Sequence, residues 1–172
     1  ISAYHPTLIA QMVGYEFDND DIHQSFADMY RVDYQTSKEL TFKQLYGGVF
    51  EEYKELEFFK RVDKYLEDLV NEEEIVCKSG YVFKNDGIKK QKLLNYILQN
   101  TETYYNVLIL EEIIKILKGK NTKIIHYTYD SFLLDVDKSE KEVVKTILGV
   151  FDIYSFRTKM SWGTKYGSLE SV

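Results

Sequence analysis

The stretch SKELTFKQLYGG (residues 37–48) places Lys38, Phe42 and Tyr46 four residues apart and then ends in two adjacent glycines. Residues with this spacing lie on one face of an α-helix, and glycine favours the end of a helix. The stretch therefore predicts a helix over 36–46 with an ammonium group, an aromatic ring and a phenol along one side. Such a side can bind a phosphate and stack on a base or a sugar. Equally, Phe42 and Tyr46 can be core residues beneath an exposed Lys38.

Helical patterns surround this stretch on both sides. Upstream, an apolar segment over 8–13 follows an expected opening strand, and acidic N-cap residues precede a helix over 21–30. Downstream, apolar residues at helical spacing predict helices over 51–70, 89–117 and 138–150. Because no Gly- or Ser-rich linker interrupts these patterns, we expect one compact unit.

Two segments have the composition of β-hairpins. Residues 75–84 (IVCKSGYVFK) are two short β-rich runs joined by a Ser-Gly pair, and residues 122–137 (TKIIHYTYDSFLLDVD) place Asp130 and Ser131 at a bend. A final strand is expected near 154–161. The order of elements predicts an α+β fold, in which a small antiparallel sheet is backed by helices and preceded by a helical lobe.

Composition limits the function classes. The single cysteine excludes an internal disulfide framework, and no apolar run has the length of about 18 residues that a membrane span needs. We therefore expect a cytoplasmic protein with no membrane partner. The net charge of -6 gives no global basic field, which counts against nucleic acid as a partner. One hypothesis is thus a non-enzymatic, acidic α+β module that binds other proteins.

Two further groups of residues suggest chemistry. Asp130, at the bend of a hairpin, is a hard-oxygen ligand of the kind that Mg²⁺ prefers, although a turn aspartate chosen for local hydrogen bonding has the same pattern. Asn95 and Gln99 lie four residues apart on the expected long helix, so their amides point the same way. Such amides can donate to the acceptors that every base pair shows in the minor groove, or they can simply face water.

Taken in order, these segments resemble the polymerase core of family A DNA polymerases, the class of bacterial DNA polymerase I and many phage replicases. The resemblance implies a partial polymerase domain: the end of the first palm motif over 1–15, fingers helices over 16–72 and palm over 73–172. A thumb and any exonuclease domain are absent from the chain. The segments that carry the resemblance are DIHQSF (21–26), SKELTFKQLYGG (37–48), NYILQ (95–99) and YDSFLLD (129–135).

The resemblance implies a DNA-directed DNA polymerase that adds deoxynucleotides to a primer 3′ end. Its partners are then deoxynucleoside triphosphates and primer-template DNA, and its cofactor is a pair of Mg²⁺ ions. The implied roles are triphosphate binding by His23 and Lys38, sugar contact by Phe42, template-base contact by Tyr46 and Gly47, and primer-template contact by Asn95 and Gln99.

The chain also departs from the family pattern. Asp130 matches the metal-binding aspartate, but the other catalytic aspartate would stand immediately before Ile1, which offers only its backbone carbonyl to the second metal. His5 occupies the place of a glutamate that screens the sugar. Tyr34 and Ser131 replace an arginine and a glutamate. We therefore expect a fragment that is inactive alone, from a divergent phage or mobile-element enzyme working in a bacterial cell.

Overall fold

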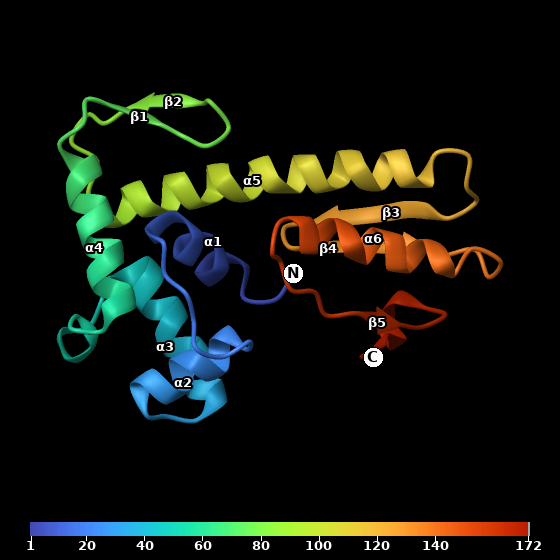
Figure 1. Ribbon diagram of the computed structural model, residues 1–172, viewed down its shortest axis with the longest axis horizontal. Coiled ribbons are helices and arrows are strands. Elements are labelled where there is room, and N and C mark those ends of the chain that lie inside the picture. The colour runs from blue at the N-terminus through green and yellow to red at the C-terminus, as the bar shows by residue number, and fades with distance from the viewer. Residues whose placement is uncertain (172) are drawn as a thin grey trace. The chain divides into compact units, whose positions relative to one another are not determined.

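The computed structural model describes residues 1–171 and confirms the α+β class (Figure 1). Two short 3₁₀ helices cover Glu51–Tyr53 and Tyr166–Ser168. The strands form three separate antiparallel pairs rather than one sheet: β1 (Glu74–Val76) with β2 (Val82–Lys84), β3 (Lys123–Thr128) with β4 (Ser131–Asp135), and β5 (Ser161–Trp162) with β6 (Glu170–Ser171). The α-helices are α1 (Tyr4–Val13), α2 (Ile22–Tyr30), α3 (Tyr34–Gly47), α4 (Glu57–Val70), α5 (Lys90–Leu117) and α6 (Glu142–Ile153).

The chain divides into two compact units, so the expectation of one compact unit is wrong. The first, which we call the helical unit, is His5–Tyr104 and holds α1 to α4, the β1–β2 hairpin and the first half of α5. The second, which we call the hairpin unit, joins Ile1–Tyr4 to the chain from Tyr105 onward. Its main elements are the second half of α5, the β3–β4 hairpin and α6.

Aromatic side chains form the core of the helical unit. Phe26 of α2 and Phe58 of α4 are fully buried, and their ring centroids lie 5.2 Å apart in an edge-to-face arrangement. Tyr15 and Phe17, in the connection after α1, complete the cluster with edge contacts to Phe58 and Phe26. Such pairs stabilise a core beyond the area they bury. The cluster therefore fixes α2 and α4 against each other.

Side-chain caps determine where α2 and α3 begin. Asp21 accepts hydrogen bonds from the backbone N–H groups of His23 and Gln24, at 3.0 and 3.3 Å, and so satisfies two of the unpaired donors at the start of α2. Asp33 does the same for α3 by accepting from the Thr36 N–H at 3.0 Å. Because Asp33 is the cap, α3 begins at Tyr34, two residues before the predicted start.

Gly48 ends α3 in a conformation that disfavours a side chain. Its φ is +106°, and its N–H donates to the Gln44 carbonyl at 3.1 Å. A Cβ added there would lie 2.2 Å from Gln91 Nε2. We expect Gly48→Ala to lower the free energy of unfolding by about 1 kcal/mol or more, as measured by urea denaturation. Gly47→Ala is the matched control, because its Cβ would meet nothing within 4 Å; an equal loss in both variants would contradict the prediction.

The β1–β2 hairpin is held to α5 by its inward face. Ile75 is buried with Leu93 and Ile97 of α5, and Phe83 packs against the same cluster. Gly80 takes a positive φ of 82° at the turn, where its N–H donates to the Cys77 carbonyl at 2.9 Å. The predicted hairpin over 75–84 is confirmed.

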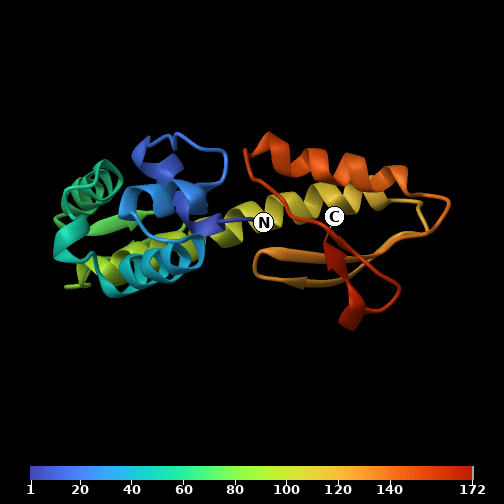
Figure 2. The same ribbon diagram turned by 90° about the horizontal axis from the view of Figure 1, so that it is seen from below.

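In the hairpin unit, two helices back the β3–β4 hairpin. Figures 1 and 2 show α6 and the second half of α5 beside the hairpin on the same side. Phe132 of β4 meets Phe151 of α6 with ring centroids 5.7 Å apart, and Ile109 and Ile113 of α5 are fully buried. The bend falls at Tyr129 and Asp130, so that Ser131, expected at the bend, is the first residue of β4.

Three predicted elements are absent, divided or shortened in the structure, and the helix predicted over 138–150 instead covers Glu142–Ile153. The opening strand is wrong, because α1 already begins at Tyr4 and accommodates Pro6 in its first turn, where no backbone N–H needs a partner. The helix over 51–70 is divided, because Leu56 is extended and α4 starts after it. The strand over 154–161 is reduced to Ser161–Trp162, because α6 continues to Ile153 and the next residues form an irregular turn.

Candidate functional site

His23, Tyr34 and Lys38 form a cluster that joins the N-terminal halves of α2 and α3. The Lys38 Nζ lies 4.4 Å from the centre of the Tyr34 ring, and the His23 ring stands edge-on to the same ring at a centroid distance of 6.0 Å. His23 and Lys38 are 15 residues apart in the sequence, and the fold brings both side chains to the Tyr34 ring. The direct partner of the Lys38 ammonium is an aromatic ring, a cation–π contact that leaves its positive charge in place.

Tyr34 is itself oriented by the α2 cap. Its hydroxyl donates to Asp21 Oδ2 at 3.0 Å. Burial opposes ionisation of Asp21, but the hydrogen bonds from Tyr34 and from the N–H groups of Gln24 and His23 together keep the pKa of this carboxyl below its ordinary value. Asp21 therefore stays ionised and holds the Tyr34 ring beneath Lys38.

Phe42 and Tyr46 continue this side of α3 over its next two turns. Their ring centroids lie 4.6 Å apart. Phe42 is 65% exposed, whereas Tyr46 and Lys38 are half-buried. The alternative in which Phe42 is a core residue is therefore wrong. An exposed phenylalanine beside a cation is a surface suited to stacking on a flat, anionic ligand.

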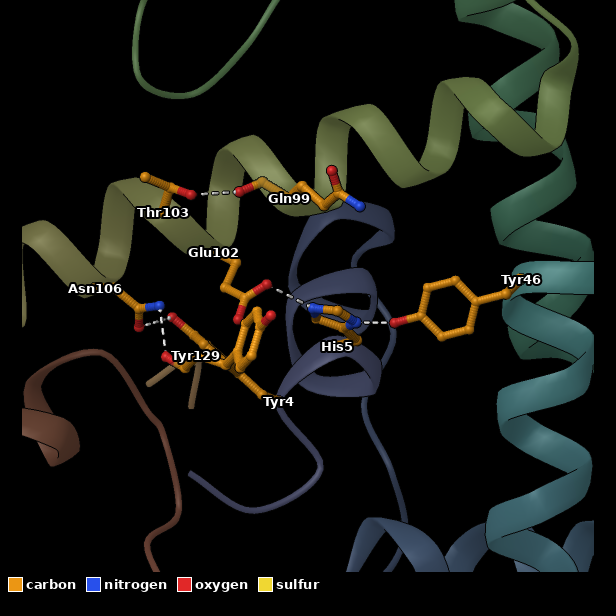
Figure 3. A network of polar contacts seen from close by, with 8 residues as sticks. All are labelled: Tyr4, His5, Tyr46, Gln99, Glu102, Thr103, Asn106 and Tyr129. Atoms are coloured by element: carbon orange, nitrogen blue, oxygen red, sulfur yellow. Dashed lines mark hydrogen bonds and ion pairs between the residues drawn. The ribbon is translucent and has the colours of Figure 1, made fainter. Parts of the chain in front are cut away.

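His5 lies between two polar partners in the helical unit (Figure 3). Its Nδ1 is hydrogen-bonded to the Tyr46 hydroxyl, and its Nε2 lies 2.9 Å from Glu102 Oε2. Burial and the nearby Glu102 charge raise the pKa of Tyr46 to about 12. Sequence reasoning identified His5 and Tyr46 but missed Glu102. The available signal was helical spacing, because Glu102 follows Asn95 and Gln99 on the same side of the predicted helix.

The two amides of α5 differ in exposure. Gln99 is exposed, and its backbone carbonyl accepts a hydrogen bond from the Thr103 hydroxyl at 2.9 Å (Figure 3). Asn95 is half-buried, and its Oδ1 is a buried atom without a hydrogen-bond partner within residues 1–171. Of this predicted pair, Gln99 is the one more open to a ligand.

Gly47 lies at the rim of a cavity of about 940 Å³ in the helical unit. Its carbonyl accepts a hydrogen bond from Gln91 Nε2 at 3.3 Å, and Lys90 and Leu94 also line the cavity. The residue is exposed and has no side chain, so a flat group can approach its backbone closely.

Asp130 and Ile1, the predicted metal ligands, meet in the hairpin unit. The Ile1 nitrogen donates to the Asp130 carbonyl. Asn106 of α5 donates to the Tyr129 carbonyl at 2.9 Å and accepts from the Tyr4 hydroxyl at 3.0 Å (Figure 3). Asn106, which sequence reasoning missed, thus holds the turn from which the exposed Asp130 projects.

The donor set suits magnesium in part. Asp130 offers a carboxylate and Ile1 a carbonyl, which are the hard-oxygen donors that Mg²⁺ prefers together with water and substrate phosphates. Within the described chain, no group of three or more His, Cys, Asp or Glu side chains is arranged to hold a metal ion. A magnesium ion at this turn would therefore need donors besides Asp130 and Ile1.

No family model and no curated protein matches this chain. In the part of the chain that the structure describes, no helix is both long enough and apolar enough to cross a bilayer.

Proposed function

We propose that this chain is part of a DNA-directed DNA polymerase of the family A type, which adds deoxynucleotides to a primer 3′ end. The observation that supports it best is the cluster of His23, Tyr34 and Lys38. The residues that the resemblance assigns to the triphosphate, His23 and Lys38, come from different helices and contact the same ring.

The chemistry of this side of α3 suits a nucleoside triphosphate. Lys38 supplies a point charge for a phosphate, and His23 adds a second group that can donate to phosphate oxygens. The exposed Phe42 ring, one turn along α3, offers a face for the sugar, and Tyr46 and Gly47 follow on the side of the template base. Phosphate, sugar and base would then lie in order along one helix.

Tyr34 stands where the family has an arginine. A positive charge is lost by this replacement, but the tyrosine ring holds the Lys38 ammonium at 4.4 Å. We propose that Tyr34 compensates by fixing Lys38 in position before the nucleotide arrives, because a preorganised charge stabilises a transition state better than a flexible one.

Asp130 is proposed to be the catalytic carboxylate. Two bound Mg²⁺ ions would activate the primer 3′ oxygen and stabilise the leaving pyrophosphate. Asp130 would contribute a ligand from a turn that Asn106 holds, Ile1 would contribute its carbonyl, and a second carboxylate would come from the longer protein. Gln99 and Asn95 would contact the minor groove of the primer-template.

The test is binding of a primer-template together with the matched deoxynucleotide, measured by fluorescence anisotropy with and without Mg²⁺. We expect Mg²⁺-dependent binding that a mismatched nucleotide does not support, and primer extension by the longer protein. Absence of extension by the longer protein would refute the proposal. Binding of other proteins without any binding of DNA would favour the acidic interaction module instead.

Phe42 gives a prediction on sugar selection in the longer protein. Phenylalanine has no hydroxyl to replace the hydrogen bonding that is lost when a nucleotide lacks its 3′-OH. We expect Phe42→Tyr to raise dideoxynucleotide incorporation relative to the normal substrate by about tenfold, the worth of one hydrogen bond. The measurement is the ratio of kcat/KM for the two nucleotides. An unchanged ratio would remove Phe42 from the sugar pocket.

A further inference from the structure

Glu102 lies outside every motif that supports the proposed function, yet it contacts the candidate site. It projects from α5 toward His5 of α1, and His5 in turn contacts Tyr46 of α3 (Figure 3). One hydrogen-bonded chain thus joins three helices of the helical unit.

The direction of this chain follows from hydrogen-bond chemistry. An ionised carboxylate can only accept, so the His5 Nε2 that faces Glu102 must carry a proton. In the neutral ring the Nδ1 is then an acceptor, and the Tyr46 hydroxyl must donate to it. The Tyr46 hydroxyl therefore donates to His5, and His5 donates to the Glu102 carboxylate. The same carboxylate-to-imidazole arrangement fixes the tautomer and orientation of histidines in many active sites.

Burial strengthens the hydrogen bonds that join Tyr46, His5 and Glu102. The Glu102 and His5 side chains are only 14% and 25% exposed, so their interaction is less screened by water than one on the surface. Burial and the Glu102 charge raise the pKa of Tyr46 to about 12, which keeps the phenol protonated at neutral pH and able to donate. The ring of Tyr46 also contacts Phe42, so the position of Tyr46 affects the exposed Phe42 ring on the same side of α3.

We propose that Glu102 is a positioning residue, which fixes the His5 tautomer and thereby holds Tyr46 and the neighbouring sugar-contacting surface of α3 in place. The structural part stands on the three contacts alone. Its consequence for catalysis rests on the proposed function: because His5 would lie near the 2′ carbon of the incoming sugar, Glu102 would determine how strictly ribonucleotides are rejected.

The first experiment uses this chain and needs no catalytic activity. Nitrogen-15 NMR of His5 reports the tautomer, and ¹³C-tyrosine NMR, with Tyr46→Phe to assign the signal, reports the Tyr46 titration. We expect the Nε2–H tautomer, and a lower Tyr46 pKa in Glu102→Gln, which keeps the shape and removes the charge. Glu111→Gln, an exposed site on the same helix, is the control. Glu102→Asp should restore part of the effect.

An Nδ1–H tautomer in the unchanged chain, or a Tyr46 titration that is identical in Glu102→Gln and in the control, would overturn the proposal. The signals of the remaining tyrosines show whether each variant is folded. If Glu102→Gln fails to fold, the tautomer of the unchanged chain and the Glu102→Asp titration still decide between the outcomes.

The second experiment uses the longer protein and compares kcat/KM for ribonucleotides and deoxynucleotides. We expect Glu102→Gln to reduce discrimination by about tenfold, with kcat for deoxynucleotides little changed. Equal discrimination in an active Glu102→Gln enzyme would overturn the sugar-selection role. Failure of the unchanged longer protein to extend primers would refute the proposed function instead, and the NMR result on this chain would stand independently.

Discussion

Replacing Asp130 with asparagine in the longer protein is expected to slow single-turnover nucleotide addition about a thousandfold or more, because under the proposed function the change removes a charged metal ligand. Folding should change little. Asp130 is exposed at the bend between β3 and β4, and the hydrogen bonds from Ile1 and Asn106 that hold the bend go to the backbone carbonyls of Asp130 and Tyr129, not to the Asp130 carboxylate. An asparagine there should alter stability by no more than about 0.5 kcal/mol.

The control for this prediction is Asp135→Asn. Asp135 is an exposed aspartate at the far end of β4, where its register partner is Lys123. The Asp135→Asn variant of the longer protein should extend primers at close to the parental rate. If Asp130→Asn melts normally and still extends a primer within about tenfold of that rate, Asp130 is only a turn residue and the polymerase proposal loses its catalytic centre.

Local signals in the sequence were sufficient for most of the helices. Asp21 predicted the start of α2 because a side-chain cap needs only residues within one turn. The end of α3 at Gly47 and Gly48 was predicted for the same reason, since the positive φ of Gly48 is a property of one residue. The long apolar period of α5 also predicted its bounds to within a residue.

The elements that failed depend on contacts that are not local. The segment over 154–161 has β-favouring residues, but Phe156 is buried against Tyr105 of α5 and Tyr4 near the N-terminus, and the described chain forms a turn there and no strand before Ser161. Propensity in such a segment is overridden by burial. The opening strand failed because α1 already begins at Tyr4, which is buried with Leu8, four residues later, on one face of this helix.

In the candidate site, too, the features set by local spacing could be predicted from the sequence, and those set by distant contacts could not. Lys38, Phe42 and Tyr46 share a side of one helix, so their spacing was readable from the sequence. Glu102 lies 97 residues from His5, and no local pattern links the two. Exposure was not readable either: nothing in the spacing of Phe42 distinguishes a core residue from a binding surface until its 65% exposure is known.

Lys38→Ala should lower kcat/KM for deoxynucleotides in the longer protein by about a hundredfold, because under the proposed function it removes a preorganised positive charge that binds the triphosphate. Stability should fall by only about 0.5–1 kcal/mol, the worth of a partly exposed cation–π contact with Tyr34. Lys43→Ala, an exposed lysine on another side of α3, is the matched control and should leave kcat/KM nearly unchanged.

The two consequences of losing Lys38 can be separated by a second substitution. Lys38→Arg keeps a positive charge and can stack its planar guanidinium on the Tyr34 ring, so it should preserve stability and recover part of kcat/KM. Tyr34→Phe keeps the ring and removes the hydroxyl that Asp21 holds, so it should lower kcat/KM less than Lys38→Ala does. If Lys38→Ala and Lys43→Ala lower kcat/KM equally, the charge acts only through the general field of the protein. The contact of Lys38 with Tyr34 would then be structural, and the cluster with His23 would not be a triphosphate site.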